Sequence, residues 1–208
     1  MERLTITLWT ILTLLTSIKV YAQDNLNQKL IATLDSMVSL DQKIQQDIYF
    51  NKDKKKEDSL FRQESEILKG DLLIAGRIFN KHGFPGFDLV GTKGTYNFWL
   101  LVQHCDSDTT FQKDVLVAMK EQVDRKNANA FNYAHLVDRV KFNTGQKQVY
   151  GTRITFDKDW NAIPEDFDNW DKVDEMRKAL GIETLKEYLD RATKFNKERA
   201  KEKDGTKN

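Results

Sequence analysis

The segment that most constrains the fold is residues 94–108, because every side chain in 98–102 is large and apolar. A helix with apolar side chains in every direction has no solvent-facing side, so we expect this one to be central and buried. The run ends with Gln103, His104 and Asp106. We expect these groups to have partners, since an unpaired buried amide or imidazole costs on the order of 1–3 kcal/mol.

The N-terminus predicts export. An apolar run at residues 8–15 follows two charged residues and precedes a Val-Tyr-Ala pattern that ends at Ala22, as in a secretory signal peptide. The run is short for a membrane span, so we expect cleavage before Gln23 rather than an uncleaved anchor, and no stable membrane span afterwards. The mature protein is then periplasmic or extracellular.

Composition excludes one class of partner. Lys and Arg number 33 and Asp and Glu number 32, for a net charge of +1. A groove that follows nucleic-acid phosphates normally shows a basic excess, so we predict no nucleic-acid partner. Cys105 is the single cysteine, which rules out an internal disulfide and leaves stability to packing.

Apolar residues recur at intervals of three and four over most of the chain, which is typical of amphipathic helices. Two β-prone runs, one before and one after residues 157–159, predict one small hairpin. We therefore predict a mainly α fold, a single helical globular domain with a small β-hairpin near residues 146–163. The predicted division is a signal peptide at 1–22, one helical domain at 23–193 and a charged, frayed tail at 194–208. Helices are expected over residues 24–48, from about 59 to 82, from 94, from 109, over 129–140, from 173 to 180 and from 184.

Local signals place several boundaries. Residues 51–58 are expected to form a solvated link or helix end and residues 84–94 a loop packed onto the body of the protein. Thr109 and Thr184 each begin a capping-box pattern, so Gln112 has a sufficient structural explanation as the third residue of a helix. Gly83 is expected to end a helix.

Three groups of polar residues lie beside strongly apolar segments and are the candidate site. In the catalytic hypothesis, His104 is a general acid or base and Arg139 holds an anionic group. In the structural alternative, the histidine bonds to loop carbonyls and the charged residues form ion pairs. The hypothetical catalytic residues are His104, Asp106, Asp138 and Arg139, and the hypothetical ligand-binding residues are Gln103, Tyr150 and Thr152.

Metal and cofactor chemistry have little support in the sequence. A metal site would recruit His104, Asp106 and either His135 or Asp138, but none of the zinc spacings is present. His82 and His135 fall where a helix end and a helix face would place solvated residues. No phosphate-binding glycine signature occurs in the glycine-punctuated connector. We predict no metal and no cofactor.

The order of these motifs resembles a family of uncharacterised bacterial proteins, a domain of unknown function. The resemblance covers about residues 75–191. Arg153 stands where the family pattern has glutamine. The matching residues are Gly83, Pro85, Val90, Gly91, Trp99, Gln103, His104, Asp106, Gln112, Asp138, Arg139, Tyr150, Gly151, Thr152, Arg177, Gly181 and Tyr188.

The resemblance implies that the three polar groups are features of the family, but it carries over no activity, substrate, cofactor or partner. The leading hypothesis is an exported soluble protein that binds an unknown small molecule or envelope protein without catalysis. The alternative is a metal-independent hydrolase or transferase that uses His104 and Arg139. An enzyme should have a solvent-reachable His104 bonded to Asp106 or Asp138 beside a pocket, whereas a binding protein should have these groups saturated.

Overall fold

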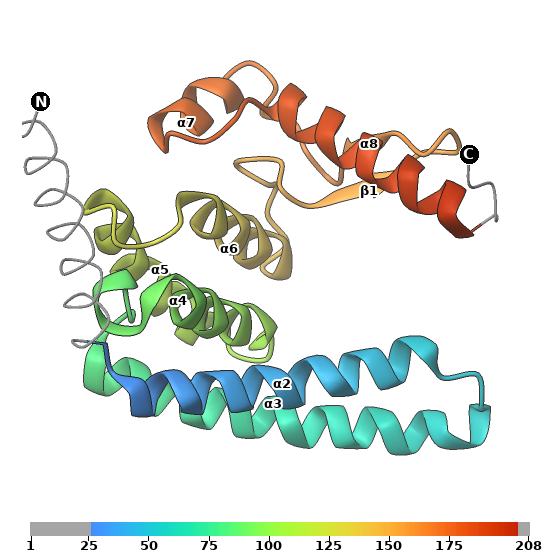
Figure 1. Ribbon diagram of the computed structural model, residues 1–208. Coiled ribbons are helices and arrows are strands. Elements are labelled where there is room, and N and C mark those ends of the chain that lie inside the picture. The colour runs from blue at the N-terminus through green and yellow to red at the C-terminus, as the bar shows by residue number, and fades with distance from the viewer. Residues whose placement is uncertain (1–25, 204–208) are drawn as a thin grey trace, which may run out of the picture. The chain divides into compact units, whose positions relative to one another are not determined.

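The structure is a computed structural model that describes residues 26–203 (Figure 1). The predicted signal peptide at 1–22 lies outside the described residues. The chain divides into two compact units, Met1–Leu101 and Val102–Asn208, whose contacts are described separately below. Within residues 26–203, no helix combines the length and the apolar character needed to cross a membrane.

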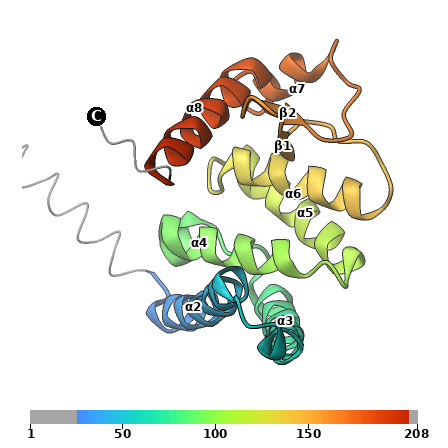
Figure 2. The ribbon, with the colours of Figure 1, turned by 90° about the vertical axis from the view of Figure 1, so that its right-hand side faces the viewer.

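The first unit contains a long helical hairpin, in which α2 (Gln28–Phe50) and α3 (Lys54–His82) lie side by side (Figure 2). Of the two predictions for residues 51–58, the link is limited to residues 51–53, because α3 already begins at Lys54, and residues 54–58 form the exposed start of that helix. Asp53 explains the early start, since its Oδ1 accepts a hydrogen bond from the amide of Lys55 at 3.0 Å and caps the helix. The side chains buried along the two helices are mostly apolar: Leu30, Leu34, Met37, Ile44, Ala75 and Ile78.

Helix α4 (Phe87–His104) carries the apolar run, and its burial is confirmed: Phe98, Leu101 and Val102 have no exposed area. The predicted loop at residues 84–94 is wrong in part, since α4 starts at Phe87. The helix is interrupted at Gly91, whose backbone has φ 68° and ψ 175°. This conformation is costly for residues with a Cβ, so glycine permits the kink between the two helical parts.

The second unit contains α5 (Thr109–Asp124) and α6 (Ala130–Asn143), which pack on each other. Next come the antiparallel strands β1 (Ile154–Phe156) and β2 (Ala162–Pro164), with Thr155 opposite Ile163. The short α7 (Val173–Ala179) and the long α8 (Leu185–Lys203) complete it. Helix α8 continues through residues 194–203, which the sequence analysis assigned to a frayed tail.

The mainly helical fold class with one small hairpin is confirmed for the described residues. The hairpin is shorter than the predicted 146–163, since residues 146–151 form a loop instead. Val173, Leu185 and Tyr188 form a small buried cluster that joins α7 to α8. The capping box at Thr184 is also confirmed, because the amide of Thr184 donates to Oε2 of Glu187 at 2.8 Å.

Candidate functional site

Asp138 on α6 is fully buried and organises the loop that follows its helix. Its Oδ1 accepts hydrogen bonds from the amides of Val149 at 2.7 Å and Tyr150 at 3.0 Å. Its Oδ2 accepts from both the amide and the hydroxyl of Thr152, each at 2.8 Å. Four hydrogen bonds satisfy the two oxygens of a carboxylate. These contacts support a structural role for Asp138 and explain why it lies on a buried helix face.

Two side chains from α7 and α8 donate hydrogen bonds to backbone carbonyl groups of the same loop. Nη1 of the fully buried Arg177 donates to the carbonyl of Tyr150 at 2.7 Å, and Nε donates to the carbonyl of Glu183 at 2.7 Å. The hydroxyl of Tyr188 donates to the carbonyl of Thr152 at 2.9 Å. The 149–152 loop is therefore fixed through its amides by Asp138 and through its carbonyls by α7 and α8.

Gly151 allows this loop to pack closely. Its φ is +68°, and a Cβ at this position would lie 3.0 Å from Cδ1 of the buried Leu185. Both facts favour glycine. The predicted Tyr150-Gly151-Thr152 element is therefore a loop that packs on α8 and not a strand.

Asp106 and Arg139 form a second group. Nε and Nη2 of Arg139 donate to the two carboxylate oxygens of Asp106 at 2.8 and 2.6 Å, and Asn143 adds a bond to Oδ1 at 2.6 Å. Partial burial would raise the pKa of Asp106, but the hydrogen bonds and positive charge of Arg139 outweigh it and hold the pKa below its ordinary value. The planar fork of Arg139 is thus occupied by a carboxylate of its own chain.

Gln112 is buried, and its position corrects the first capping-box assignment. Asp108 caps α5, since its Oδ1 accepts from the amide of Phe111 at 2.9 Å. The Gln112 side chain instead donates to the carbonyl of Val102 at 3.0 Å and approaches that of Gln103 at 3.4 Å. These carbonyls belong to the last turn of α4, which lacks helical partners for them. The capping-box spacing fits both arrangements, so spacing alone could not choose between them.

His104 is the last residue of α4 and is half-buried. The four hydrogen bonds to Asp138 come from the 149–152 loop, and the carboxylate oxygens of Asp106 accept from Arg139 and Asn143. Asp138 and Arg139 follow one another on α6, and their side chains bind different partners. Asp138 with Tyr150 and Thr152 forms one group, and Asp106 with Arg139 forms another.

His135 differs from the solvated residue expected from the sequence. It is half-buried, with its ring centroid 4.7 Å from that of Phe131 and 6.3 Å from that of Tyr188. Burial, together with the positive charges of Arg177 and Arg191, lowers the pKa of His135 to about 4. In residues 26–203, no cluster of three His, Cys, Asp or Glu side chains is arranged to hold a metal ion.

A groove of about 480 Å³ lies elsewhere in the second unit, where α8 faces β2 and the turn before α7. We call it the α8 groove. Trp170 is 58% exposed at this groove and packs edge-on against Phe167, with ring centroids 5.0 Å apart. The sequence did not indicate this groove, because separate segments between residues 161 and 193 line it and none of its residues was a candidate site residue. The residues that line it are Asn161, Ala162, Trp170, Val173, Asp174, Leu185, Lys186, Leu189, Asp190 and Thr193.

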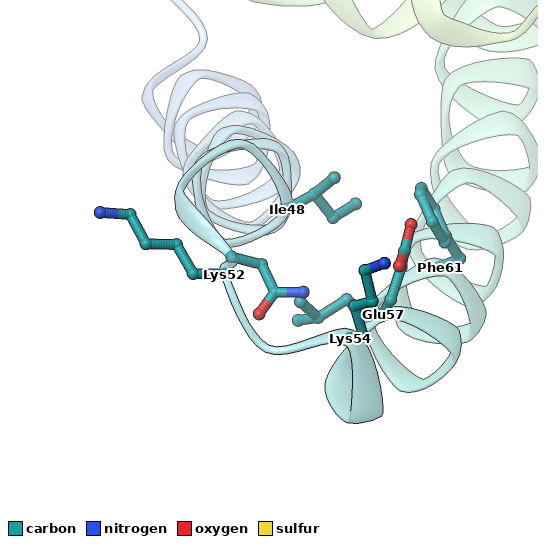
Figure 3. A pocket seen from close by; sticks show the side chains of 7 residues that line it. Ile48, Lys52, Lys54, Glu57 and Phe61 are labelled. Carbon is teal, nitrogen blue, oxygen red and sulfur yellow. The ribbon is translucent and has the colours of Figure 1, made fainter.

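A cavity of about 240 Å³ lies at the tip of the helical hairpin in the first unit. In Figure 3, Ile48 and Phe61 face each other across it, whereas the ammonium group of Lys52 points away. The chain merely turns here between two helices, so the cavity has no side chains beyond those of the link and the helix ends. None of the four hypothetical catalytic residues lines this cavity or the α8 groove.

A family model matches most of the chain. Residues 24–195 match the model of a family described as "Family of unknown function (DUF6624)". The match extends further toward the N-terminus than the resemblance noted from the motifs. No curated protein and no solved structure matches the chain.

Proposed function

The chain belongs to this family of unknown function, and we propose that it is an exported, non-catalytic binding protein of the bacterial cell envelope whose ligand occupies the α8 groove. One observation carries the proposal. Asp106, Asp138 and Arg139, which suggested catalysis, are bonded to groups of their own chain, while an open groove with an exposed tryptophan lies apart from them. Ligand sites commonly combine an apolar lining with a few polar groups at the edge.

The lining indicates the chemistry of the ligand. Trp170, Val173 and Leu189 provide an apolar surface. The charged groups at the edge already have partners: Lys186 Nζ lies 2.6 Å from Asp190 Oδ2, and Asp174 Oδ1 accepts from the amide of Leu185 at 2.7 Å. A charged ligand would have to displace these partners. The groove therefore suits a small neutral ligand with one apolar face, such as a sugar ring, and hydrogen-bonding groups at its rim.

The test is a ligand screen by thermal denaturation, with neutral sugars, small neutral amides and short uncharged peptides as probes. A compound that fits the groove is expected to raise the melting temperature of the wild type and not that of Trp170→Ala. Trp160→Ala is the matched control, since Trp160 is 54% exposed but does not line the groove. A compound that stabilises wild type and Trp170→Ala equally would show that it binds outside the α8 groove.

Export is tested separately. The apolar run at residues 8–15 supports cleavage before Gln23. When the gene is expressed in a bacterial host, the intact mass of the protein outside the cytoplasm should correspond to a chain that begins at Gln23. Recovery of a chain that still begins at Met1 would contradict export by a cleaved signal peptide.

A further inference from the structure

A second cavity, of about 260 Å³, lies between the start of α2 and the end of α3, entirely within the first unit. These two ends meet because the helices form a hairpin (Figure 1). It shares no residue with the α8 groove. It is called the cationic cavity below because of the side chains at its edge.

Three permanently charged cations line this cavity: Lys29 from α2, and Arg77 and Lys81 from α3. His82 also lines it, and no acidic residue does. Asn27 also lines the cavity and offers a hydrogen-bond donor. Its Oδ1 accepts a hydrogen bond from the amide of Leu30 at 3.0 Å, which leaves the side-chain NH2 group to donate. The polar edge of the cavity therefore offers mainly hydrogen-bond donors.

The charge at this cavity is of one sign, whereas the chain as a whole is almost neutral. Acids and bases are almost equal in number, and several lysines of the same unit have acidic partners, as in Lys93 with Asp35 at 2.7 Å. Among residues 26–203, no acid pairs with any of the three cations of the cavity. An anion bound there would reduce the mutual repulsion of the three positive charges.

The floor of the cavity is apolar. Leu30 and Ile78 are each 7% exposed, and Ile74 is half-buried beside them. A fully hydrated inorganic ion would gain nothing from this floor, whereas an apolar chain attached to the anion would cover it. The donors and the floor together define a ligand with a charged end and an apolar end.

We propose that the cationic cavity binds a small amphiphilic anion, a carboxylate or phosphate group that carries a short aliphatic chain. The anionic group contacts Arg77 and Lys81, and the chain lies on Leu30 and Ile78. This site is additional to the α8 groove and does not depend on the function proposed for it.

Isothermal titration of the purified protein tests the proposal with four probes. Hexanoate and hexyl phosphate each combine an anionic group with an aliphatic chain. Inorganic phosphate supplies the anionic group alone, and hexanol supplies the aliphatic chain alone. We expect the two amphiphiles to bind at least about tenfold more tightly than either half. The ratio between hexanoate and hexyl phosphate then identifies the preferred anionic group. Equal affinity for inorganic phosphate and hexyl phosphate, or no binding by either amphiphile, would overturn the proposal.

Variants locate the site. Arg77→Gln with Lys81→Gln is expected to weaken amphiphile binding at least about fivefold, because two charge-assisted contacts are lost. Lys69→Gln is the matched control, since Lys69 is an exposed lysine of the same helix outside the cavity. Trp170→Ala should bind the amphiphile like wild type. Unchanged affinity in the double variant, or an equal loss in Lys69→Gln, contradicts the assignment. If the double variant does not fold, Lys29→Gln replaces it, with at least a twofold loss expected and unchanged affinity contradictory.

Discussion

In the first unit, Asp35 is partly exposed on a helix surface, where it pairs with Lys93 at 2.7 Å and Asn97 at 2.6 Å. In the second unit, Asp138 is fully buried and accepts four hydrogen bonds from one loop. The first aspartate could be lost with the helices still packed through their apolar side chains. The second one determines the shape of the segment it binds, because no water can replace it at that depth.

The two aspartates illustrate two ways in which a sequence determines a fold, through apolar side chains and through buried polar ones. The long hairpin of α2 and α3 follows mainly the helical periodicity of its apolar residues, although Asp41 and Asp71 are buried in it as well. The region from α6 to α8 instead depends on a few buried polar side chains, chiefly Asp138, Arg177 and Tyr188, which bind backbone groups of the 149–152 loop. Substitutions of matched residues in the two units test whether this distinction is real.

The largest effect is expected for Asp138→Ala. The amides of Val149, Tyr150 and Thr152 lose their acceptor, so the free energy of unfolding should fall by about 3–5 kcal/mol. Asp35→Ala is the matched change in the first unit and should cost about 1–2 kcal/mol, because its ion pair with Lys93 is exposed to water and only the buried amide of Asn97 loses an acceptor. Urea denaturation followed by circular dichroism measures both. Equal losses would break the comparison.

The next effect is the dependence of stability on pH that His135 should cause. The unfolded chain binds a proton at His135 below its ordinary pKa of 6.5, whereas the folded chain binds it only below about 4. Stability should therefore increase as the pH rises from 4 to 6.5, by on the order of 3 kcal/mol from this group. His135→Phe cannot titrate and should show a shallower dependence in urea denaturation at several pH values. A parallel dependence in wild type and variant would show that His135 is not buried in its neutral form.

Two glycines should respond in opposite directions. Gly151→Ala is expected to cost about 1–3 kcal/mol, because φ is positive there and the new Cβ meets Leu185. Gly70→Ala lies within α3 with nothing within 4 Å of the added Cβ, and should stabilise the helix by about 0.5–1 kcal/mol. Thermal denaturation of both variants measures the two shifts. A loss in Gly70→Ala would contradict the view that α3 is an uninterrupted helix with space at this position.

The smallest loss of stability is expected for Arg139→Ala. The Arg139 and Asp106 side chains are 24% and 43% exposed, and Asn143 still bonds to Asp106 in the variant. The loss should be about 1 kcal/mol in thermal denaturation, well below that of Asp138→Ala. Arg139→Lys is the control that keeps the charge without the planar fork. A loss as large as that of Asp138→Ala would show that this pair, too, determines the fold of the second unit.

The helices could be predicted from the sequence because apolar spacing is a local property. The buried run at 98–102 and the capping box at Thr184 are examples. The role of Arg177 could not be predicted, since one of the two carbonyl groups to which it donates, that of Tyr150, belongs to a distant loop. The α8 groove was missed for the same reason, because its shape depends on how three separate segments meet.

The contact between Asp138 and its loop has a consequence for sequence variation. At Val149 and Tyr150 the carboxylate binds the peptide N–H and does not touch the side chain. The contact therefore places no demand on the identity of the residue at either position, apart from excluding proline, which has no N–H. Thr152 is different, because its hydroxyl is bound as well. One carboxylate thus tolerates diversity at two neighbouring positions and restricts the third.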